Sequence, residues 1–452
     1  MQHLSAPDSA ALVDVAPGER VVVVARAGRA AARALFAVID AGAVCVPANP
    51  SYLHDELVHV VNDAGARQLI DVDGDRAIVD AVAETTGVTV RRDVTTVAPT
   101  GPLKDDRLAM LIYTSGTTGR AKGCAHTLAG LKAGLAPLMA VWGIGPGDVV
   151  INALPLFHVH GGCVALMGPL WAGADVMLLD RFSPADVVSA ARAGGTVLMC
   201  VPTMVHRLTA HLVEHERDRA AIAALRLVTC GSAPLSPAQL EAFRAVSGQT
   251  IVERYGMSET LITLSNTLER RVPGAVGWPL PGTETRVVDD ELWVRGPGVM
   301  RGYFDRPDAD AQTLVAADDA GGRPWLKTGD AVTVDDDGCV RIVGRLSQDI
   351  LKVGGFKLSA REIEDACASH PAIAEVAVVG APDDEWGERV CAVVVVRAGQ
   401  TLTLPALQAH VQLAPVKLPR QLVLTDALPR TALGKVQKQA LKALASAAGA
   451  AT

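Results

Sequence analysis

The sequence predicts an α/β protein: a large N-terminal domain, built from parallel-sheet α/β subdomains and a small β unit, followed by a small α+β C-terminal domain. Three observations support this prediction. Strand patterns rich in β-branched residues alternate with Ala- and Leu-rich helical patterns up to about residue 230. Gly- and Pro-rich segments then interrupt the alternation. Hydrophobic residues make up 49% and charged residues 20% of the 452 residues, which suffices for a large buried core.

The first part of the chain contains the clearest strand patterns. Residues 20–26 (RVVVVAR) form the first predicted buried strand, and an alanine-rich helical pattern follows to about Ile39. Short apolar runs predict further strands at Leu69–Val72, Val149–Leu154, Val176–Leu179 and Val197–Val201. Strands that alternate with helices in this way form a mostly parallel sheet that helices cover on both faces.

The pattern changes after about residue 270. Segments Val272–Gly282 and Gly296–Tyr303 are rich in glycine and proline. Between them lie the alternating runs Thr285–Val288 and Glu291–Val294, which predict a small antiparallel β unit.

A domain boundary is predicted near Gly344–Ser347, which gives domains 1–345 and 346–452. The second domain has about a hundred residues, a usual size for an independent unit. Its predicted elements are helices at Ala360–Ser369, Leu404–Gln412 and Val436–Ala443 and strands at Ile373–Val379 and Val390–Val396.

Composition excludes several classes of protein. The net charge is −7 and no dense Lys/Arg stripe occurs, so we expect no nucleic-acid partner. The eight cysteines are scattered without a CxxC pair, which indicates buried thiols in a reducing compartment, the cytoplasm. The most apolar long stretch, Gly161–Leu179, is broken by Gly, Pro and Asp175, so we expect no membrane span.

The segment LIYTSGTTGRAKG (Leu111–Gly123) is the strongest candidate for a binding loop. An apolar strand pattern ends in the hydroxyl- and glycine-rich run Thr114, Ser115, Gly116, Thr117, Thr118 and Gly119, and Lys122 follows. Glycines let backbone N–H groups approach a polyphosphate, and hydroxyls add donors. The standard nucleoside-triphosphate loop does not fit, because Ala121 replaces its second glycine and Gly123 its Ser or Thr. The alternative is a flexible polar loop.

Glu253–Thr260 (ERYGMSET) is the second strong cluster. Tyr255 could stack on adenine, Gly256 permits close approach, and Ser258 offers a phosphate donor. Glu259 suffices as a protein ligand for Mg²⁺, which prefers one or two carboxylates plus phosphate oxygens. Glu253 and Arg254 would point to opposite faces of a strand. The alternative is a strand-to-helix junction with a solvated charge pair.

Two shorter clusters follow predicted strands. His158 and His160 in PLFHVHG have no third ligand nearby, which argues against zinc; they either bond to backbone in a strand-end loop or form a pocket wall beside the substrate. The run Gly231, Ser232 and Ala233 in GSAPL follows a strand at Leu225–Thr229. It is either a plain turn or part of a nucleotide site, since such sheets bind nucleotides at the carboxyl ends of their strands.

Three more residues are weak candidates when each is taken alone. Asp330 in KTGD could accept both hydroxyls of a ribose, or lie in a β-turn. Arg345 precedes the predicted boundary, where an interdomain salt bridge is the alternative role. Lys435 in LGK has the alternative of a plain surface charge.

Taken together and in order, these clusters resemble the adenylate-forming superfamily of acyl-CoA synthetases, luciferases and peptide-synthetase adenylation domains. The resemblance covers nearly the whole chain and rests on the combination TSGTTGRAKG, PLFHVHG, GSAPL, ERYGMSET, KTGD, GR(x)₈GG(x)₆EIE from Gly344 to Glu364, and LGK. Within the superfamily, the segments ERYGMSETLITLSNTLERRVPGAVGWPLPG, LKVGGFKLSAREIE and WGERVCAVVVV are most similar to malonyl-CoA and methylmalonyl-CoA synthetases.

The resemblance implies an ATP-dependent acid–CoA ligase that uses Mg²⁺, ATP and coenzyme A and makes an acyl-adenylate before the thioester. Carried over by motif position, Thr114–Lys122 would hold the β,γ-phosphates, Ser258 the α-phosphate and Glu259 the Mg²⁺. The other implied roles are Tyr255 and Gly256 with Gly231, Ser232 and Ala233 for adenine, Asp330 and Arg345 for ribose, Lys435 for the reacting carboxylate and α-phosphate, and Gly354 and Gly355 for CoA.

Between the two steps, rotation of a mobile C-terminal domain would withdraw Lys435 from the reacting groups and bring in the CoA-binding segment at Gly354 and Gly355. The hinge position, usually Asp or Lys in the superfamily, is Ser347 here. A dicarboxylate substrate needs a desolvated cation, and Arg254 is the best candidate because guanidinium binds carboxylate bidentately; the alternative is a structural ion pair for Arg254. His158 and His160 would assist in binding the acid.

Malonate or methylmalonate is therefore the expected acid. Two other functions remain open at this stage: an enzyme that adenylates another short or aryl acid or loads a carrier-protein phosphopantetheine, and a nucleotide-binding homologue without catalysis. Peptide-synthetase domains usually have Asp after the Phe of PLFH to hold an α-amine, so His158 argues against an amino acid substrate.

Overall fold

The computed structural model describes residues 2–5, 15–72, 74, 77–92, 105–114, 121–319, 322–354, 356–383, 385–430 and 436–449. The chain divides into two compact units. Unit 1 comprises Met1–Thr285 and Val294–Leu326, and unit 2 comprises Arg286–Trp293 and Lys327–Thr452. Within the described ranges, no helix is both long enough and apolar enough to cross a bilayer.

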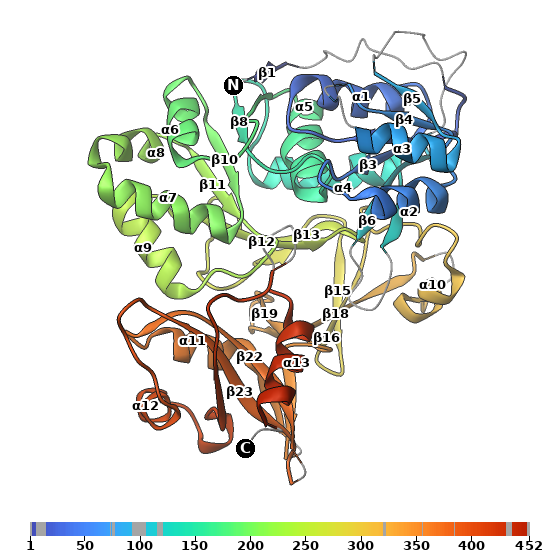
Figure 1. Ribbon diagram of the computed structural model, residues 1–452. Coiled ribbons are helices and arrows are strands. Elements are labelled where there is room, and N and C mark those ends of the chain that lie inside the picture. Colours follow the sequence, from blue (N-terminus) through green and yellow to red (C-terminus); the bar gives the residue numbers. More distant parts are fainter. Residues whose placement is uncertain are drawn as a thin grey trace. The chain divides into compact units, whose positions relative to one another are not determined.

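Unit 1 contains a six-stranded sheet near its N-terminus (Figure 1). Its order is β5 (Thr89–Arg91), β4 (Gln68–Ile70), β2 (Arg20–Val24), β3 (Val44–Ala48), β6 (Leu108–Thr114) and β7 (Lys122–Thr127). All neighbours are parallel except β6 and β7. The helices around it are α1 (Arg29–Asp40), α2 (His54–Ala64) and α3 (Ala77–Thr86).

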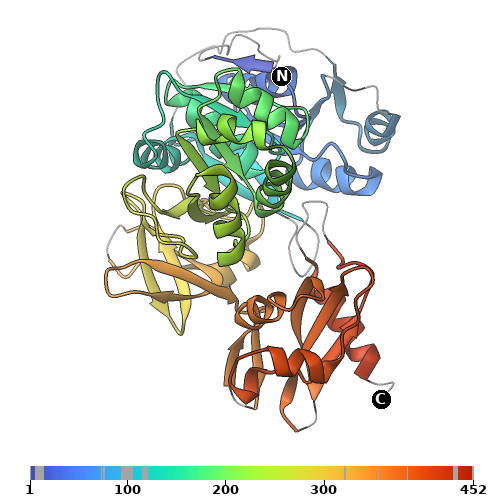
Figure 2. The ribbon, with the colours of Figure 1, turned by 90° about the vertical axis from the view of Figure 1, so that its left-hand side faces the viewer.

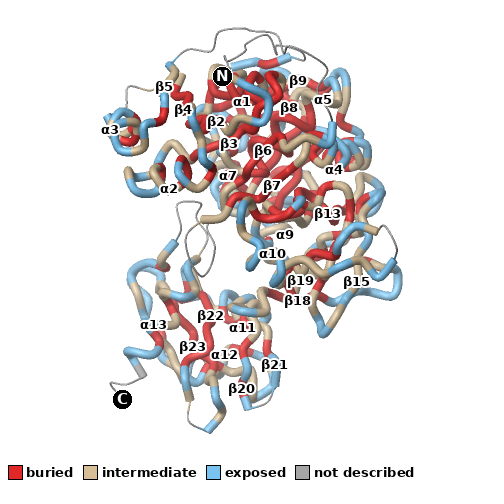
Figure 3. Tube along the Cα trace, turned by 90° about the vertical axis from the view of Figure 1, so that its right-hand side faces the viewer, coloured by how far each residue is buried: buried red, intermediate tan, exposed pale blue. Residues whose placement is uncertain are grey.

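Strand β2 shows why this sheet is covered on both faces. Residues 21–24 are each at most 1% exposed, although alternate side chains of a strand point to opposite faces. Val22 and Val24 share a core cluster with Leu57 of α2 and Val79 of α3, so α2 and α3 cover that face. Helix α1 contacts β2 and β3 and buries its own apolar stripe. The labelled strands β2, β3 and β6 are mostly buried in Figure 3.

The second sheet of unit 1 has eight strands. Its order is β1 (Gln2–Leu4), β9 (Asp175–Leu178), β8 (Val149–Asn152), β10 (Val197–Cys200), β11 (Leu227–Cys230), β12 (Val252–Met257), β13 (Leu261–Ser265) and β14 (Trp278–Pro279). The run from β9 to β12 is parallel, and β1, β13 and β14 are antiparallel to their neighbours. The carboxyl ends of the parallel strands therefore share one edge, where their following loops meet.

Most helices that accompany this sheet come from the connections between its strands, and α4 (Leu128–Val141) connects β7 of the first sheet to β8. The others are the π-helix η1 (Val159–Met167), α5 (Gly168–Trp171), α6 (Pro184–Arg192), α7 (Pro202–Glu214), the 3₁₀ turn η2 (Glu216–Asp218), α8 (Arg219–Ala223) and α9 (Pro237–Ser247). The apolar stretch Gly161–Leu179 forms most of η1, α5 and β9. The predicted α/β alternation is thus confirmed, with strand ends that differ by at most two residues.

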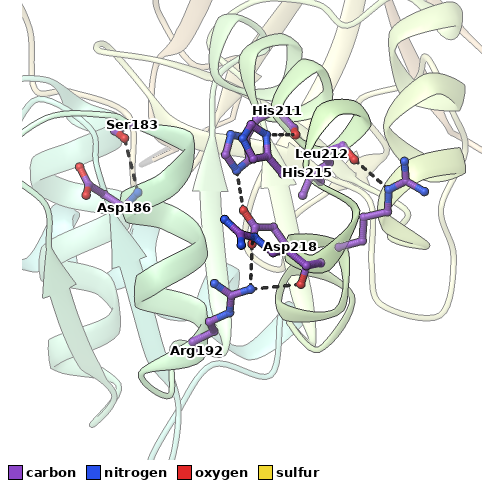
Figure 4. Close-up of polar contacts among 9 residues, drawn as sticks. Ser183, Asp186, Arg192, His211, Leu212, His215 and Asp218 are labelled. Carbon is purple, nitrogen blue, oxygen red and sulfur yellow. Dashed lines mark hydrogen bonds and ion pairs between the residues drawn. The ribbon is translucent and has the colours of Figure 1, made fainter.

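A buried carboxylate joins α6, α7 and η2 (Figure 4). Asp218 accepts hydrogen bonds from His211 Nε2 and Arg192 Nη2, each at 2.8 Å, and the hydrogen bond from His211 is the main reason that the pKa of Asp218 lies below its usual range. The His211 ring stacks on His215, with centroids 4.1 Å apart. These residues lie among structural helices, and we assign them a packing role.

The predicted small β unit is a five-stranded sheet. Its order is β15 (Glu284–Val288), β16 (Glu291–Arg295), β18 (Trp325–Val334) and β17 (Leu314–Val315), with β19 (Val340–Arg345) also paired to β18, and α10 (Pro307–Thr313) precedes β17. Strand β18 is antiparallel to both β17 and β19. The division between the two units runs through β15, β16 and β18.

Unit 2 ends in a second five-stranded sheet, orange to red in Figures 1 and 2. Its order is β21 (Phe356–Ser359), β20 (Ile350–Val353), β23 (Gly387–Val396) and β22 (Ile373–Asp383), with β24 (Gln421–Leu424) paired to β23. The helices are α11 (Ala360–Ala368), α12 (Leu404–His410), the 3₁₀ turn η3 (Pro415–Lys417) and α13 (Lys438–Gly449).

The two faces of this sheet carry separate cores. Val378 packs with Ile363 of α11 and Leu407 of α12, whereas its neighbour Val379 packs with Leu441 of α13 on the opposite face. The sequence predicts that the last helix begins at Val436, but α13 begins at Lys438, because the backbone of Val436 instead pairs with Arg430 in an antiparallel bridge.

Candidate active site

The phosphate-loop segment is the connection of a β-hairpin. Strands β6 and β7 pair antiparallel, and Thr114 and Lys122 are directly opposite each other at the end of the ladder. Ser115, Gly116, Thr117, Thr118 and Gly119 lie outside the described residues. The two described ends of the segment, Thr114 and Lys122, are therefore held in fixed register beside the loop.

The second motif forms a turn between two strands, β12 and β13, and not the strand-to-helix junction considered above. Tyr255 and Gly256 lie on β12, with a bulge between them opposite β13. A Cβ at Gly256 would come within 1.9 Å of the Leu261 carbonyl oxygen, so this position requires glycine. Ser258 and Glu259 occupy the turn, which the Thr260 N–H closes on the Met257 carbonyl.

A buried histidine supports this turn from the neighbouring sheet. His126 on β7 donates its Nε2–H to the Ser258 carbonyl at 2.7 Å. Burial lowers the pKa of His126 to about 4, and the hydrogen bond to Ser258 offsets only part of that effect. The imidazole is thus neutral at physiological pH. It links the strand that begins with Lys122 to the turn that carries Ser258 and Glu259.

Glu259 is a buried carboxylate with one oxygen engaged. Its Oε1 accepts a hydrogen bond from the Tyr303 hydroxyl at 2.9 Å, and no described residue donates to its other oxygen. Across the described ranges, no three His, Cys, Asp or Glu side chains gather in a group that could hold a metal by themselves. One carboxylate with a free oxygen fits Mg²⁺, which takes its remaining ligands from phosphates and water.

Arg254 and Glu253 point to opposite faces of β12, as the strand alternation predicts. Glu253 accepts the Gly274 N–H at 2.7 Å. Arg254 is 4% exposed, and its Nε and Nη2 have no hydrogen-bond partner. Its guanidinium lies against Gly231, where a Cβ would come within 2.4 Å of Nη1. Among the described residues no carboxylate pairs with Arg254, which argues against the structural ion pair considered above.

Burial lowers the pKa of Arg254 to about 10, and the nearby Cys230 thiol opposes that shift. The guanidinium therefore stays charged at neutral pH. A buried, unpaired cation is costly, by several kcal/mol in typical proteins. An anionic ligand that reached this guanidinium would remove much of that cost.

His160 lies beside this cation, on the π-helix η1. The ring is buried; Nδ1 faces the Ser232 hydroxyl at 3.3 Å, and Nε2 has no partner. Burial holds the pKa of His160 well below its usual range, and Arg254 and His158 lower it further. A neutral His160 whose Nδ1 accepts from Ser232 presents an Nε2–H donor. His158 precedes η1 and is half-buried.

The loop after β11 completes this edge of the sheet. Gly231 continues from β11 and bonds to the Cys200 carbonyl, and Ser232 adopts a left-handed backbone conformation with φ of 70°. Ala233 is exposed. The π-helix η1 after β8, the loop after β11 and strand β12 therefore bring together three side chains that are separate in the sequence: His160, Ser232 and Arg254.

In unit 2, Asp330 and Arg345 are cross-strand partners on β18 and β19. Arg345 Nε lies 3.0 Å from Asp330 Oδ1, and its Nη1 donates to the Thr328 carbonyl at 2.6 Å. Asp330 lies within a strand, so the β-turn alternative is wrong, and Arg345 pairs inside unit 2. Ser347 follows β19, in a turn where Asp349 accepts the Arg345 N–H at 2.9 Å.

Lys435 and Gly355 lie outside the described residues, but both flanks of Lys435 are anchored. Arg430 and Val436 form the bridge named above, and Lys438 makes ion pairs with Asp349 at 2.5 Å and Glu364 at 2.8 Å. Gly354 follows β20, and the Trp386 ring fills the space that a Cβ would need there.

His126 and Tyr303 are not among the residues that the sequence motifs predict. Each is a single polar residue in an apolar or Gly-rich segment, and neither belongs to a short motif. A histidine in a segment as apolar as Cys124–His126 is a signal that the side chain has a hydrogen-bond partner, because a buried imidazole requires one, but the sequence does not say which residue that partner is.

Comparison with known protein families shows the class of protein to which the chain belongs. The sequence pattern of the family described as AMP-binding enzyme matches residues 9–304, and that of the AMP-binding enzyme C-terminal domain matches residues 362–435. The chain belongs to the AMP-binding enzyme family, which confirms the resemblance inferred from the motifs.

Individual proteins and solved structures are similar to the chain over most of its length. The chain is 35% identical to malonate–CoA ligase ACSF3, mitochondrial, of Xenopus laevis, over 90% of this chain and 79% of that protein. ATP-bound MatB from Rhodopseudomonas palustris superposes with a TM-score of 0.86 at 32% identity, over 95% of this chain and 89% of MatB. A malonyl-CoA ligase solved with methylmalonyl-CoA and AMP is 36% identical, with a TM-score of 0.68 and 91% of each chain covered.

The buried His126 predicts a specific pH dependence of stability. Its unfolded pKa is about 6.5 and its folded pKa about 4, so the unfolded state binds a proton first as the pH falls. The free energy of unfolding should therefore fall between pH 6.5 and 4. His126→Gln, which keeps a neutral donor, should reduce that fall by on the order of 3 kcal/mol.

Urea denaturation at a series of pH values measures this effect. His206→Gln, at an exposed position on α7, is the matched control and should leave the slope unchanged. His160, whose pKa burial also lowers, is present in every variant, so the comparison rests on the difference between the two substitutions. Equal slopes for both would contradict a neutral, buried His126.

Proposed function

We propose that this protein is an ATP-dependent acid–CoA ligase that activates malonate or methylmalonate. A carboxylate oxygen of the acid attacks the α-phosphorus of ATP, and pyrophosphate leaves. The thiol of coenzyme A then attacks the acyl carbonyl of the adenylate, loses its proton and releases AMP. Membership of the AMP-binding enzyme family and similarity to malonate–CoA ligases support this proposal.

The observation that carries the choice of acid is the buried, unpaired guanidinium of Arg254. Malonate has two carboxylates, one to react and one to bind. A charged hydrogen bond to the second is worth roughly 1.5–3 kcal/mol, which corresponds to about ten- to a hundredfold preference over a monocarboxylate. His160 Nε2, the other buried atom without a partner here, supplies a second donor, and His158 lines the same region.

The triphosphate residues act through position and charge. Thr114 to Gly119 and Lys122 hold the β,γ-phosphates, and Ser258 the α-phosphate. Glu259 would hold Mg²⁺, whose chemistry is to neutralise charge on the phosphate oxygens. Phosphoryl transfer needs such preorganised positive charge more than it needs proton transfer. The fixed register of Thr114 and Lys122 and the supported turn at Ser258 favour these roles.

The remaining roles follow the family motifs. Tyr255 and Gly256, with Gly231 to Ala233, frame adenine; Asp330 and Arg345 take the ribose. Lys435 neutralises the reacting carboxylate and α-phosphate in the first step only. Gly354 and Gly355 line the path of CoA, and Ser347 is the hinge of a mobile domain formed by residues 346–452. All eight cysteines are free and buried, which suits a reducing compartment such as the cytoplasm.

A panel of acids tests the proposal directly. Purified protein with Mg-ATP should release pyrophosphate with malonate and methylmalonate, and much less with acetate, benzoate or glycine. AMP and acyl-CoA should accumulate only when CoA is added. If no acid yields AMP, the protein is not a ligase. If a carrier-protein phosphopantetheine is acylated and CoA is not, then coenzyme A is not the acyl acceptor and that part of the proposal is wrong.

Arg254→Met should separate binding of the distal carboxylate from catalysis. The variant should lose about ten- to a hundredfold in kcat/KM for malonate, mainly through KM, with little change for propionate. Its melting temperature should hold or rise, because a buried unpaired charge has been replaced by an apolar side chain. Arg270→Ala, which removes a guanidinium stacked on Trp278, is the control. Parallel losses for both acids would assign Arg254 a structural role.

Lys435→Ala should divide the two half-reactions. Formation of the adenylate should be abolished, whereas thioester formation from supplied malonyl-adenylate should stay near the wild-type rate, because the lysine acts at the α-phosphate only. Pyrophosphate release and single-turnover thioester formation measure the two steps. Lys442→Ala, on α13, is the control. Equal loss of both steps would contradict the assignment.

A further inference from the structure

Tyr303 contacts two residues of the proposed triphosphate site. Its hydroxyl donates to Glu259 Oε1 at 2.9 Å, and the ammonium of Lys122 lies 4.6 Å from the centroid of its ring. Glu259 comes from the β12–β13 turn and Lys122 from the start of β7, so one side chain joins two segments 137 positions apart in the sequence. The tyrosine itself is 9% exposed.

The backbone around Tyr303 is held as if it were an extra strand beside β7. Ala125 N–H donates to the Gly302 carbonyl at 2.9 Å, and Phe304 N–H donates to the Gly123 carbonyl at 2.8 Å. Tyr303 N–H donates to Asp310 Oδ1 at 2.7 Å. The position of the ring is therefore set by backbone pairing, and does not depend on its contacts with Glu259 and Lys122.

We propose that Tyr303 is a positioning residue for adenylation. Its hydroxyl orients the Glu259 carboxylate toward Mg²⁺, and its ring holds the Lys122 ammonium where it can bind the phosphates. This inference rests on the proposed function, because it takes the roles of Glu259 and Lys122 from it. Tyr303 acts through Glu259 and Lys122 and does not itself bind substrate or metal.

The hydroxyl acts on the carboxylate in a defined way. By engaging Oε1, it leaves the second oxygen of Glu259 for a cation, and it restricts rotation of the carboxylate. A phenol is protonated at neutral pH, so the hydroxyl is a donor. Hydrogen bonds to a metal-binding side chain typically contribute about 10- to 100-fold in metal affinity.

The ring acts on the lysine. An aromatic face attracts an ammonium ion, which keeps the flexible Lys122 side chain at one end of the phosphate-loop segment. Since the hydroxyl and the ring contact different partners, conservative substitutions can remove them one at a time. Tyr303→Phe removes only the hydroxyl, whereas Tyr303→Leu removes both while it keeps an apolar side chain in the buried position.

The first test measures metal binding, without turnover. Mn²⁺ binding to the full-length enzyme with a non-hydrolysable ATP analogue is followed by electron paramagnetic resonance. Tyr303→Phe should weaken Mn²⁺ binding by about 10- to 100-fold, and Glu259→Gln should weaken it at least as much. The double variant should bind no more weakly than Glu259→Gln alone, because the hydroxyl acts through that carboxylate.

Tyr113→Phe is the matched control. Its hydroxyl also donates to a carboxylate, Asp63 Oδ2 at 2.7 Å, from the neighbouring strand β6. It should leave Mn²⁺ affinity unchanged.

The second test compares the KM for ATP at saturating Mg²⁺. Tyr303→Phe should match the wild type, and Tyr303→Leu should have a raised KM for ATP because the ring no longer holds the Lys122 ammonium.

The outcomes separate this inference from the proposed function. If Glu259→Gln weakens Mn²⁺ binding but Tyr303→Phe does not, Tyr303 has no positioning role while the metal assignment stands. If Glu259→Gln leaves Mn²⁺ binding intact, the metal assignment fails and the inference fails with it. A further loss from Tyr303→Phe in the Glu259→Gln background would also overturn the inference, because the tyrosine would then act by another route.

Discussion

The proposed chemistry depends on a buried positive charge, the Arg254 guanidinium, which pairs with no carboxylate among the residues that the structure describes. Arg254 is enclosed by the edge of the eight-stranded sheet, and two of its guanidinium nitrogens have no partner. Such a group destabilises the folded protein unless an anion binds it. The surrounding fold must therefore be stable enough to bear that cost. Four parallel strand pairs from β9 to β12, with cores that exclude water, supply that stability.

In the proposed function, the same sheet edge would account for a preference between acids. Gly231 lets the guanidinium lie against the backbone, and His160 is kept neutral by burial next to it. A neutral imidazole can donate to a carboxylate without adding a second cation that would repel the first. One charged donor and one neutral donor match a single carboxylate, which leaves the other end of a short diacid available for reaction.

The turn between β12 and β13 connects the proposed acid site to the residues proposed to bind the triphosphate. Arg254 is on the strand, and Ser258 and Glu259 follow within five residues. His126 and Tyr303 support the turn from two other segments, so its position does not depend on its own backbone alone. Preorganisation of this kind reduces the reorganisation needed when charge develops on the phosphate.

The sequence by itself determined the α/β class, the order of the predicted strands and helices, and the motifs by which the chain resembles its family. These follow from local periodicity and from short patterns in which glycine and hydroxyl residues have a direct physical reason. Tertiary structure alone decided that Arg254 has no described carboxylate partner, that His160 faces Ser232, and that His126 and Tyr303 support Ser258 and Glu259. Those facts depend on contacts between strands distant in the sequence, and no local pattern encodes which side chains meet across a sheet edge.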